Sequence, residues 1–173
     1  MKAIPTQWNG ASYRSRLEAR WAVVLSILGI GAVYEAEGFE HAGECYLPDF
    51  ELSGTGQLLA IKAESEMLND TAAWKRELEW QADMAACGMT LLIVCGPPMP
   101  GQYQVLVPDC EGPAILADCR RCRGVCWIAV DGSWGQIGMH DCREHERGPV
   151  ASVRVLAAMK RAMAERFGER GTP

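Results

Sequence analysis

A continuous apolar run, Thr90-Leu91-Leu92-Ile93-Val94-Cys95, places the strongest constraint on the fold of this chain. A run without polar residues at alternate positions is typical of a strand that is buried on both faces of its sheet. Other elements must then cover both faces. The predicted order of elements suits this arrangement, because a helix, three strands and a second helix precede the run. The sequence therefore predicts an α/β fold with a mixed central sheet flanked by helices.

Two amphipathic segments supply the helices. The first is predicted over residues 12–28, and its apolar stripe carries Tyr13, Leu17, Trp21, Val24 and Leu28. The second begins at Asn69 or Asp70 and runs to about Cys87. Its predicted inner face holds Trp74, Leu78, Gln81, Ala82 and Ala85. A position facing the cleft is an alternative for Lys75, Glu77 and Gln81, although solvated positions are favoured for each. The strands between the helices are predicted at about 32–37, 45–52 and 57–63, with a turn at residues 54–56.

Polar residues on two of these strands form the candidate catalytic site. Side chains alternate faces along a strand, so residues 60 and 62 point the same way while Ile61 points into the core. An acid at position 60, Asp49 on the neighbouring strand and the main-chain carbonyl of Ile61 would offer a divalent cation its oxygen ligands. Lys62 would stand beside the metal, where it can orient the attacking water or neutralise charge on a phosphate. Position 60, however, is Ala60.

Three segments extend this pattern: Tyr13-Arg14-Ser15-Arg16-Leu17-Glu18-Ala19-Arg20-Trp21-Ala22, Tyr34-Glu35-Ala36-Glu37-Gly38-Phe39 and Tyr46-Leu47-Pro48-Asp49-Phe50. Through about residue 98 the chain resembles phage and mobile-element members of the PD-(D/E)XK nuclease superfamily. The resemblance implies a restriction-endonuclease-like core and an endonuclease that cuts DNA with Mg²⁺ or Mn²⁺. It implies that Glu18 is an accessory acid, Asp49 the principal metal ligand and Lys62 the catalytic lysine. It also requires an acid in place of Ala60, so metal binding and cleavage are expected to be impaired.

Three explanations for Ala60 remain open. In the first explanation, another residue supplies the acid. The candidates are Glu64, which lies on the same face as residues 60 and 62 if that strand continues, and Glu51, which shares the face of Asp49. Alternatively, the chain is a natural non-cleaving relative that binds DNA or a protein partner. The third explanation is an engineered substitution. If position 60 is decisive, Ala60→Glu is expected to restore metal-dependent cleavage.

The second half of the chain carries a metal-ligand pattern of its own. The segments Cys119-Arg120-Arg121-Cys122 and Cys142-Arg143-Glu144-His145 are separated by 19 residues. Two close pairs of soft ligands can close a tetrahedron around Zn²⁺ while the chain between them forms a hairpin. Here strands are predicted at 127–130 and 134–138, with a turn at 131–133. The predicted ligands of a structural zinc are Cys119, Cys122, Cys142 and His145, and either Cys126 or His140 is close enough to replace one of them. Of the other cysteines, Cys45, Cys87, Cys95 and Cys110, most are expected to be small buried residues.

Length and composition set the remaining expectations. In 173 residues we expect a nuclease-like core at 1–108, a zinc-ribbon-like segment at 109–148, and a C-terminal helix and tail at 149–173. The apolar face of that helix is predicted at Leu156, Met159, Met163 and Phe167. No apolar run reaches 18 residues and the N-terminus lacks a signal-peptide core, so we expect no membrane association and a cytoplasmic protein of a bacterial or phage-infected cell. The formal charge of −5 argues against a general nucleic-acid coat protein, while clustered arginines at 14–20, 120–123 and 154–170 are compatible with DNA contact. The oligomeric state is left open.

Overall fold

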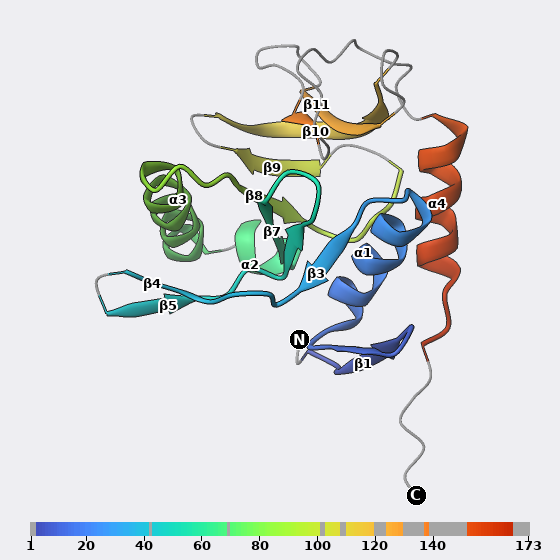
Figure 1. Cartoon of the computed structure of the whole chain (residues 1–173), viewed down its shortest axis with the longest axis horizontal. Coiled ribbons are helices and arrows are strands. Elements are labelled where there is room, and N and C mark those ends of the chain that lie inside the picture. The colour runs from blue at the N-terminus through green and yellow to red at the C-terminus, as the bar shows by residue number, and fades with distance from the viewer. Residues whose placement is uncertain are drawn as a thin grey trace, which may run out of the picture.

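The computed structural model describes residues 3–41, 43–68, 70–100, 103–107, 110–119, 124–129, 137–138 and 152–167. Within them, an eight-stranded sheet forms the centre of the fold (Figure 1). From one edge to the other, its strands are β12 (Ile137–Gly138), β11 (Val125–Ala129), β10 (Cys110–Asp118), β9 (Tyr103–Val107), β8 (Leu91–Cys95), β7 (Gln57–Lys62), β6 (Phe50–Leu52) and β3 (Ala32–Tyr34). Neighbouring strands are antiparallel except β7 and β8, which are parallel. The predicted α/β class with a mixed sheet is confirmed.

The parallel pair follows from the connection between its two strands. Between β7 and β8 the chain forms α2 (Glu64–Leu68) and α3 (Thr71–Ala86), and parallel neighbours need a crossover of this kind. α3 begins after Asp70, whose carboxylate accepts hydrogen bonds from the N–H groups of Ala72 at 2.9 Å and Ala73 at 3.1 Å. This cap satisfies N–H groups that have no partner within the helix. The extent of the second predicted helix is thereby confirmed.

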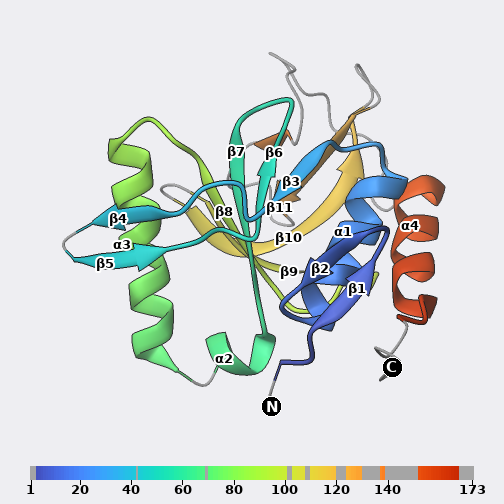
Figure 2. The same cartoon turned by 60° about the horizontal axis from the view of Figure 1, so that its bottom comes forward.

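Helices cover both faces of the sheet. α1 (Arg16–Ile27) and α4 (Val153–Ala164) lie side by side on one face, and α3 lies on the other (Figure 1, Figure 2). The side chains of β8 alternate between two hydrophobic clusters. Leu92 and Val94 pack in the cluster of α1 and α4, whereas Leu91 and Ile93 pack in the cluster of α3. All residues of β8 are buried, so the apolar run has the two-sided burial that the sequence predicts.

α1 begins at Arg16, later than predicted. The residues before it form a hairpin of β1 (Thr6–Trp8) and β2 (Ala11–Tyr13), joined by Asn9 and Gly10. Both turn residues have positive φ, 48° and 80°, as a two-residue Asn-Gly hairpin turn requires. The helical stripe that begins at Tyr13 conceals this hairpin in the sequence.

The strands predicted at 32–37 and 45–52 are shorter than expected, and the second is divided between two sheets. β3 ends before Glu35, whose φ of 47° leaves the extended region. β4 (Phe39–His41) and β5 (Glu44–Tyr46) then form a separate hairpin beside α3 (Figure 2). Pro48 separates β5 from β6, because proline lacks the N–H group that a strand ladder needs.

The buried face of α3 differs from the predicted one. Its buried residues are Glu77, Trp80, Gln81 and Met84. Three residues of the predicted face, Leu78, Ala82 and Ala85, are exposed. The ring of Trp80 stacks on Tyr46 of β5 with 5.0 Å between centroids, and this contact turns the helix relative to the predicted stripe. As a result Glu77, for which a solvated position is predicted, is only 3% exposed.

The predicted boundary near residue 108 falls between β9 and β10, which pair with each other in the central sheet. β10 pairs in turn with β11, and β11 with β12, so the strands predicted for the ribbon extend this sheet. Trp127 of β11 is fully buried beside Trp21 of α1, with ring centroids 5.9 Å apart. The described part of β10 and β11 thus shares the hydrophobic core of α1 and α4. The predicted turn at 131–133 lies outside the described residues.

α4 confirms the predicted C-terminal helix, with its buried face at Val155, Ala158, Met159 and Ala162. Of the predicted face Met159 is buried, whereas Leu156, Met163 and Phe167 are half-buried. Cys95 is buried as predicted, but Cys45 and Cys87 are exposed, because they lie in a surface hairpin and at the end of α3. No helix in the described part of the chain has the length and apolar character needed to cross a membrane.

Candidate active site

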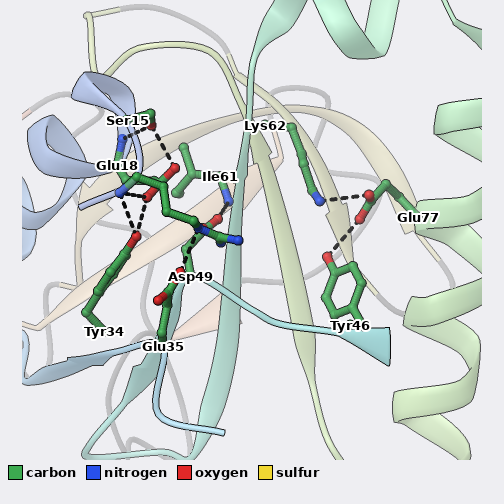
Figure 3. A network of polar contacts seen from close by, with 10 residues as sticks. Ser15, Glu18, Tyr34, Glu35, Tyr46, Asp49, Ile61, Lys62 and Glu77 are labelled. Carbon is green, nitrogen blue, oxygen red and sulfur yellow. Dashed lines mark hydrogen bonds and ion pairs between the residues drawn. The ribbon is translucent and has the colours of Figure 1, made fainter. Parts of the chain in front are cut away.

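A polar cleft of about 460 Å³ opens where the start of α1, the end of β7 and the middle of α3 meet. Its walls are formed by Arg14, Glu18, Glu44, Cys45, Tyr46, Leu47, Asp49, Ile61, Lys62, Arg76, Glu77 and Trp80. Four of the predicted site residues, Glu18, Asp49, Ile61 and Lys62, are therefore brought together. Figure 3 shows two polar groups in this region, one around Asp49 and one around Glu77, on either side of the strand that carries Lys62.

Asp49 is a buried carboxylate, 5% exposed, with both oxygens engaged. Oδ2 accepts a hydrogen bond from the main-chain N–H of Ile61 at 2.6 Å, and Oδ1 accepts one from Nη2 of Arg14 at 2.9 Å. The pKa of Asp49 is raised to about 6, mainly by burial and also by the nearby charge of Glu18. The Ile61 N–H and the charges of Arg14 and Lys62 act in the opposite direction. Burial therefore disfavours the ionised form of Asp49, and a bound cation would stabilise that form.

The raised pKa predicts a pH-dependent difference in stability between the metal-free protein and Asp49→Asn. The pKa rises from 3.8 to about 6 on folding, so the protonated carboxyl contributes stability at low pH that is lost as the pH rises through 6. We expect the free energy of unfolding of Asp49→Asn, relative to the unmodified protein, to rise by about 2 kcal/mol between pH 4 and pH 7. Urea unfolding at the two pH values measures this difference. A difference that does not change with pH would contradict the raised pKa, because any packing defect of asparagine is independent of pH.

Glu18 is buried at the first turn of α1. Its Oε2 accepts hydrogen bonds from the main-chain N–H of Arg14 at 3.0 Å and from the hydroxyl of Tyr34, and its Oε1 accepts one from Ser15 at 2.7 Å. Ser15 caps the helix and accepts a hydrogen bond from the N–H of Glu18 at 3.1 Å, an exchange that resembles a capping box. Burial and the hydrogen bond to Glu18 raise the pKa of Tyr34, which keeps this hydroxyl a donor. Glu18 lines the cleft and also fixes the main chain that precedes α1.

Lys62 extends toward α3, away from Glu18 (Figure 3). Its Nζ lies 2.7 Å from Oε1 of Glu77, and the hydroxyl of Tyr46 donates to Oε2 of Glu77 at 2.7 Å. The ammonium also lies 5.0 Å from the centroid of the Tyr46 ring, a cation–π contact. Burial and the charge of Glu77 raise the pKa of Tyr46. Glu77 is thus a third buried carboxylate of the cleft, after Asp49 and Glu18, and it is adjacent to the predicted catalytic lysine.

Ala60 does not line the cleft. It is 1% exposed and belongs to the apolar cluster on the α3 face, together with Leu58, Met67, Trp80, Met84 and Ile93. The two predicted replacements for its acid, Glu51 and Glu64, do not line the cleft either. Glu51 pairs with Leu58 in the middle of β6, and Glu64 begins α2 because β7 ends at Lys62.

The sequence contains one signal for Glu77. Trp80, Gln81 and Met84 follow it at helical spacing, so a stripe that includes a tryptophan and a methionine also includes this acid. The stripe through Leu78, Ala82 and Ala85 has the same spacing and no charged residue. The pattern of apolar and polar residues alone favours burial of this second stripe. The contact of Trp80 with Tyr46 instead places the stripe that contains Glu77 against the protein.

Of the predicted zinc ligands, Cys119 lies within the described residues, whereas Cys122, Cys142 and His145 lie outside them. Cys119 is fully buried and clusters with Ala117 and Cys126. Its N–H donates to the carbonyl of Gly124 at 2.7 Å, which brings the two ends of the β10–β11 loop together. No group of three or more His, Cys, Asp or Glu side chains suited to a metal occurs within the described ranges. Cys126, which the sequence offers as an alternative zinc ligand, lies in the same cluster as Cys119.

The charges lining the cleft are nearly balanced. Arg14, Lys62 and Arg76 face four carboxylates, those of Glu18, Glu44, Asp49 and Glu77, so one negative charge is in excess when all are ionised. A phosphodiester is also an anion and is repelled by such a site. A single divalent cation reverses the sign of the cleft, and bound cations are often the largest local charges of a site. The cleft therefore suits an anionic substrate only when it also holds a cation.

Comparison with known proteins adds no relative to this picture. No family model, curated protein or solved structure matches this chain. The residues of the cleft are therefore the basis on which a function is assigned.

Proposed function

We propose that this chain is a metal-dependent DNA endonuclease of the PD-(D/E)XK type in which Glu77 supplies the carboxylate that Ala60 lacks. One observation carries the proposal: Asp49, Lys62 and Glu77 line the same polar cleft although they come from different elements. Two buried carboxylates and a lysine that line one cleft are the groups that metal-assisted hydrolysis of a phosphodiester needs.

Asp49 and Glu77 are oxygen donors of the kind that a hard divalent cation binds. Mg²⁺ usually binds one or two carboxylates and completes its octahedral coordination with water and substrate oxygens. Asp49 and Glu77 would hold it, and its charge would offset the desolvation that raises the pKa of Asp49. When bound, Mg²⁺ or Mn²⁺ lowers the pKa of the attacking water and stabilises negative charge on the phosphate.

The cations of the cleft have distinct roles in this proposal. Lys62 is held by Glu77 and Tyr46 but remains 23% exposed, so its ammonium is accessible to a substrate. There it orients the attacking water and opposes the charge that develops on the phosphate. Arg76 is an exposed residue of α3 that lines the cleft, and in this proposal it would contact a neighbouring phosphate of the DNA backbone.

Cleavage assays on several forms of DNA test the proposal. Supercoiled, linear and branched DNA are incubated with equal amounts of protein in the presence of Mg²⁺, Mn²⁺ or EDTA. We expect cleavage of at least one substrate that requires the metal and is lost in Asp49→Asn and in Lys62→Ala. No cleavage of any substrate with either metal would contradict the proposal.

A second function, a non-cleaving factor that binds DNA or a protein partner, is favoured by a different observation. Two of the buried acids already have a cationic partner within the protein: Arg14 for Asp49 and Lys62 for Glu77. These two ion pairs form without metal. A protein of this kind would bind DNA or its partner equally well in EDTA and in Mg²⁺, and Asp49→Asn would leave that binding unchanged.

We also propose a structural zinc held by Cys119, Cys122, Cys142 and His145. Elemental analysis of the purified protein is expected to give one zinc per chain, because the set provides four ligands at suitable spacing. The double variant Cys119→Ser, Cys142→Ser should lose the metal. Cys126→Ser should keep it, unless Cys126 replaces one member of the set. Zinc content near zero in the unmodified protein, or full retention in the double variant, would refute the ligand assignment.

A further inference from the structure

Arg14 is the cation that pairs with Asp49 in the protein. Its guanidinium contacts two carboxylates, with Nη2 2.9 Å from Oδ1 of Asp49 and Nε 2.6 Å from Oε1 of Glu35. The side chain of Arg14 is 54% exposed, whereas that of Asp49 is 7% exposed. Arg14 is therefore the solvent-side partner of a carboxylate that is otherwise enclosed by protein.

The main chain of Arg14 is fixed, although its side chain is exposed. Its N–H donates to Oε2 of Glu18 at 3.0 Å and to the hydroxyl of Tyr34 at 2.9 Å. The next residue, Ser15, caps α1. Any change in the position of the guanidinium must therefore come from rotation of its side chain, and the guanidinium stays within reach of the cleft.

From these contacts we infer that Arg14 is a switch residue, which neutralises Asp49 in the free protein and moves to a phosphate of bound DNA when a divalent cation takes its place. The inference rests on the proposed function. Oδ2 of Asp49 is held by the N–H of Ile61, so Oδ1 is the oxygen over which a cation and Arg14 compete. Like charges at one oxygen repel each other strongly in a buried site. The released guanidinium has the planar donors that suit a phosphate.

Metal and DNA then bind cooperatively. Without DNA, the metal must displace Arg14 from Asp49, and its affinity is reduced by the strength of that ion pair. With DNA present, a phosphate takes over the guanidinium and the reduction disappears. Because coupling between two ligands is reciprocal, DNA affinity must rise with metal by the same factor. Arg14 thus makes the protein bind DNA more tightly when metal is bound than when it is absent. Glu35 is the second carboxylate that holds its guanidinium.

Calorimetric titration with Mn²⁺ in the absence of DNA tests the inference. Arg14→Gln removes the competing cation and is expected to bind Mn²⁺ roughly tenfold more tightly than the unmodified protein. Damage to the fold would weaken binding, so the direction of the effect separates the two causes. Arg161→Gln is the matched control, because Arg161 also pairs with a carboxylate, that of Glu165 at 3.3 Å, but lies on α4 and does not line the cleft. It should bind Mn²⁺ as the unmodified protein does.

A second titration measures DNA binding with Mn²⁺ present, in a Lys62→Ala background that prevents cleavage. Adding Arg14→Gln is expected to weaken binding of a fluorescein-labelled duplex roughly tenfold, and Arg14→Lys should retain part of the affinity. If Asp49→Asn abolishes Mn²⁺ binding but Arg14→Gln does not tighten it, the switch is wrong and the proposed function stands. If neither the unmodified protein nor Arg14→Gln nor Asp49→Asn binds Mn²⁺, the proposed function itself fails.

Discussion

Glu77→Gln is expected to lower DNA cleavage by about 100-fold or more while leaving the protein folded, because removal of one preorganised electrostatic group from an active site typically costs this much. Glutamine keeps the shape of the side chain and can still accept the hydrogen bond from Tyr46 that Glu77 accepts at 2.7 Å. It removes the charge that pairs with Lys62 at 2.7 Å and that would hold the metal. Initial rates on the preferred DNA substrate at saturating Mg²⁺ measure the effect.

Glu79→Gln provides the matched control on the same helix. Glu79 is 62% exposed, pairs with Lys75 at 3.6 Å and does not line the cleft that contains Lys62. Exposed pairs of this kind contribute little, so its cleavage rate should match that of the unmodified protein. Equal rates for Glu77→Gln and the unmodified protein would show that Glu77 serves only to pair Lys62.

Ala60→Glu is expected to destabilise the protein by about 3 kcal/mol or more, since it buries an ionised carboxylate and overfills a packed cluster. Ala60 is 1% exposed and shares its cluster with Trp80 and Ile93. Under the proposed function Glu77 supplies the acid beside Lys62, so cleavage by the folded fraction should not exceed that of the unmodified protein. Urea unfolding in EDTA gives the stability, and cleavage assays below the transition give the rate.

The control for this substitution is Ala85→Glu, which places the same side chain on the exposed face of α3. Its stability should lie within about 0.5 kcal/mol of the unmodified protein. An Ala60→Glu protein that is as stable as this control and cleaves far faster than the unmodified chain would support the sequence-based expectation instead. Position 60 would then decide activity, and Glu77 would be a structural partner of Lys62.

The sequence predicts well the strand that is buried on both faces of the sheet and the helices that cover it. The run at 90–95 requires helices on two faces of a sheet, and β8 has them. The hairpins β1–β2 and β4–β5 are missed for local reasons. Asn9 and Gly10 form a turn inside a stretch with helical spacing, and Glu35 interrupts an extended segment by taking a positive φ. Neither interruption alters the hydrophobic pattern on which the prediction depends.

Some residues of the candidate site can be predicted from local sequence, whereas others depend on tertiary contacts. Glu18, Asp49 and Lys62 are found from local motifs, and the fold brings them to one cleft. Glu77 cannot be identified in that way, because the rotation of α3 depends on a ring contact between Trp80 and Tyr46, which are far apart in the sequence. The partner of Asp49 depends on tertiary structure too, since Arg14 and Asp49 are 35 residues apart. The zinc ligands Cys122, Cys142 and His145 remain a prediction from spacing alone.

The central claim, that Asp49 and Glu77 together hold the catalytic metal, is tested most directly by Mn²⁺ binding to the unmodified protein beside Asp49→Asn and Glu77→Gln. Calorimetry without DNA is predicted to show one saturable Mn²⁺ site in the unmodified chain. Each variant should weaken that site by about tenfold or more, since each removes one of two anionic ligands. The absence of a saturable site in the unmodified protein, or an affinity that Glu77→Gln leaves unchanged, would contradict the claim.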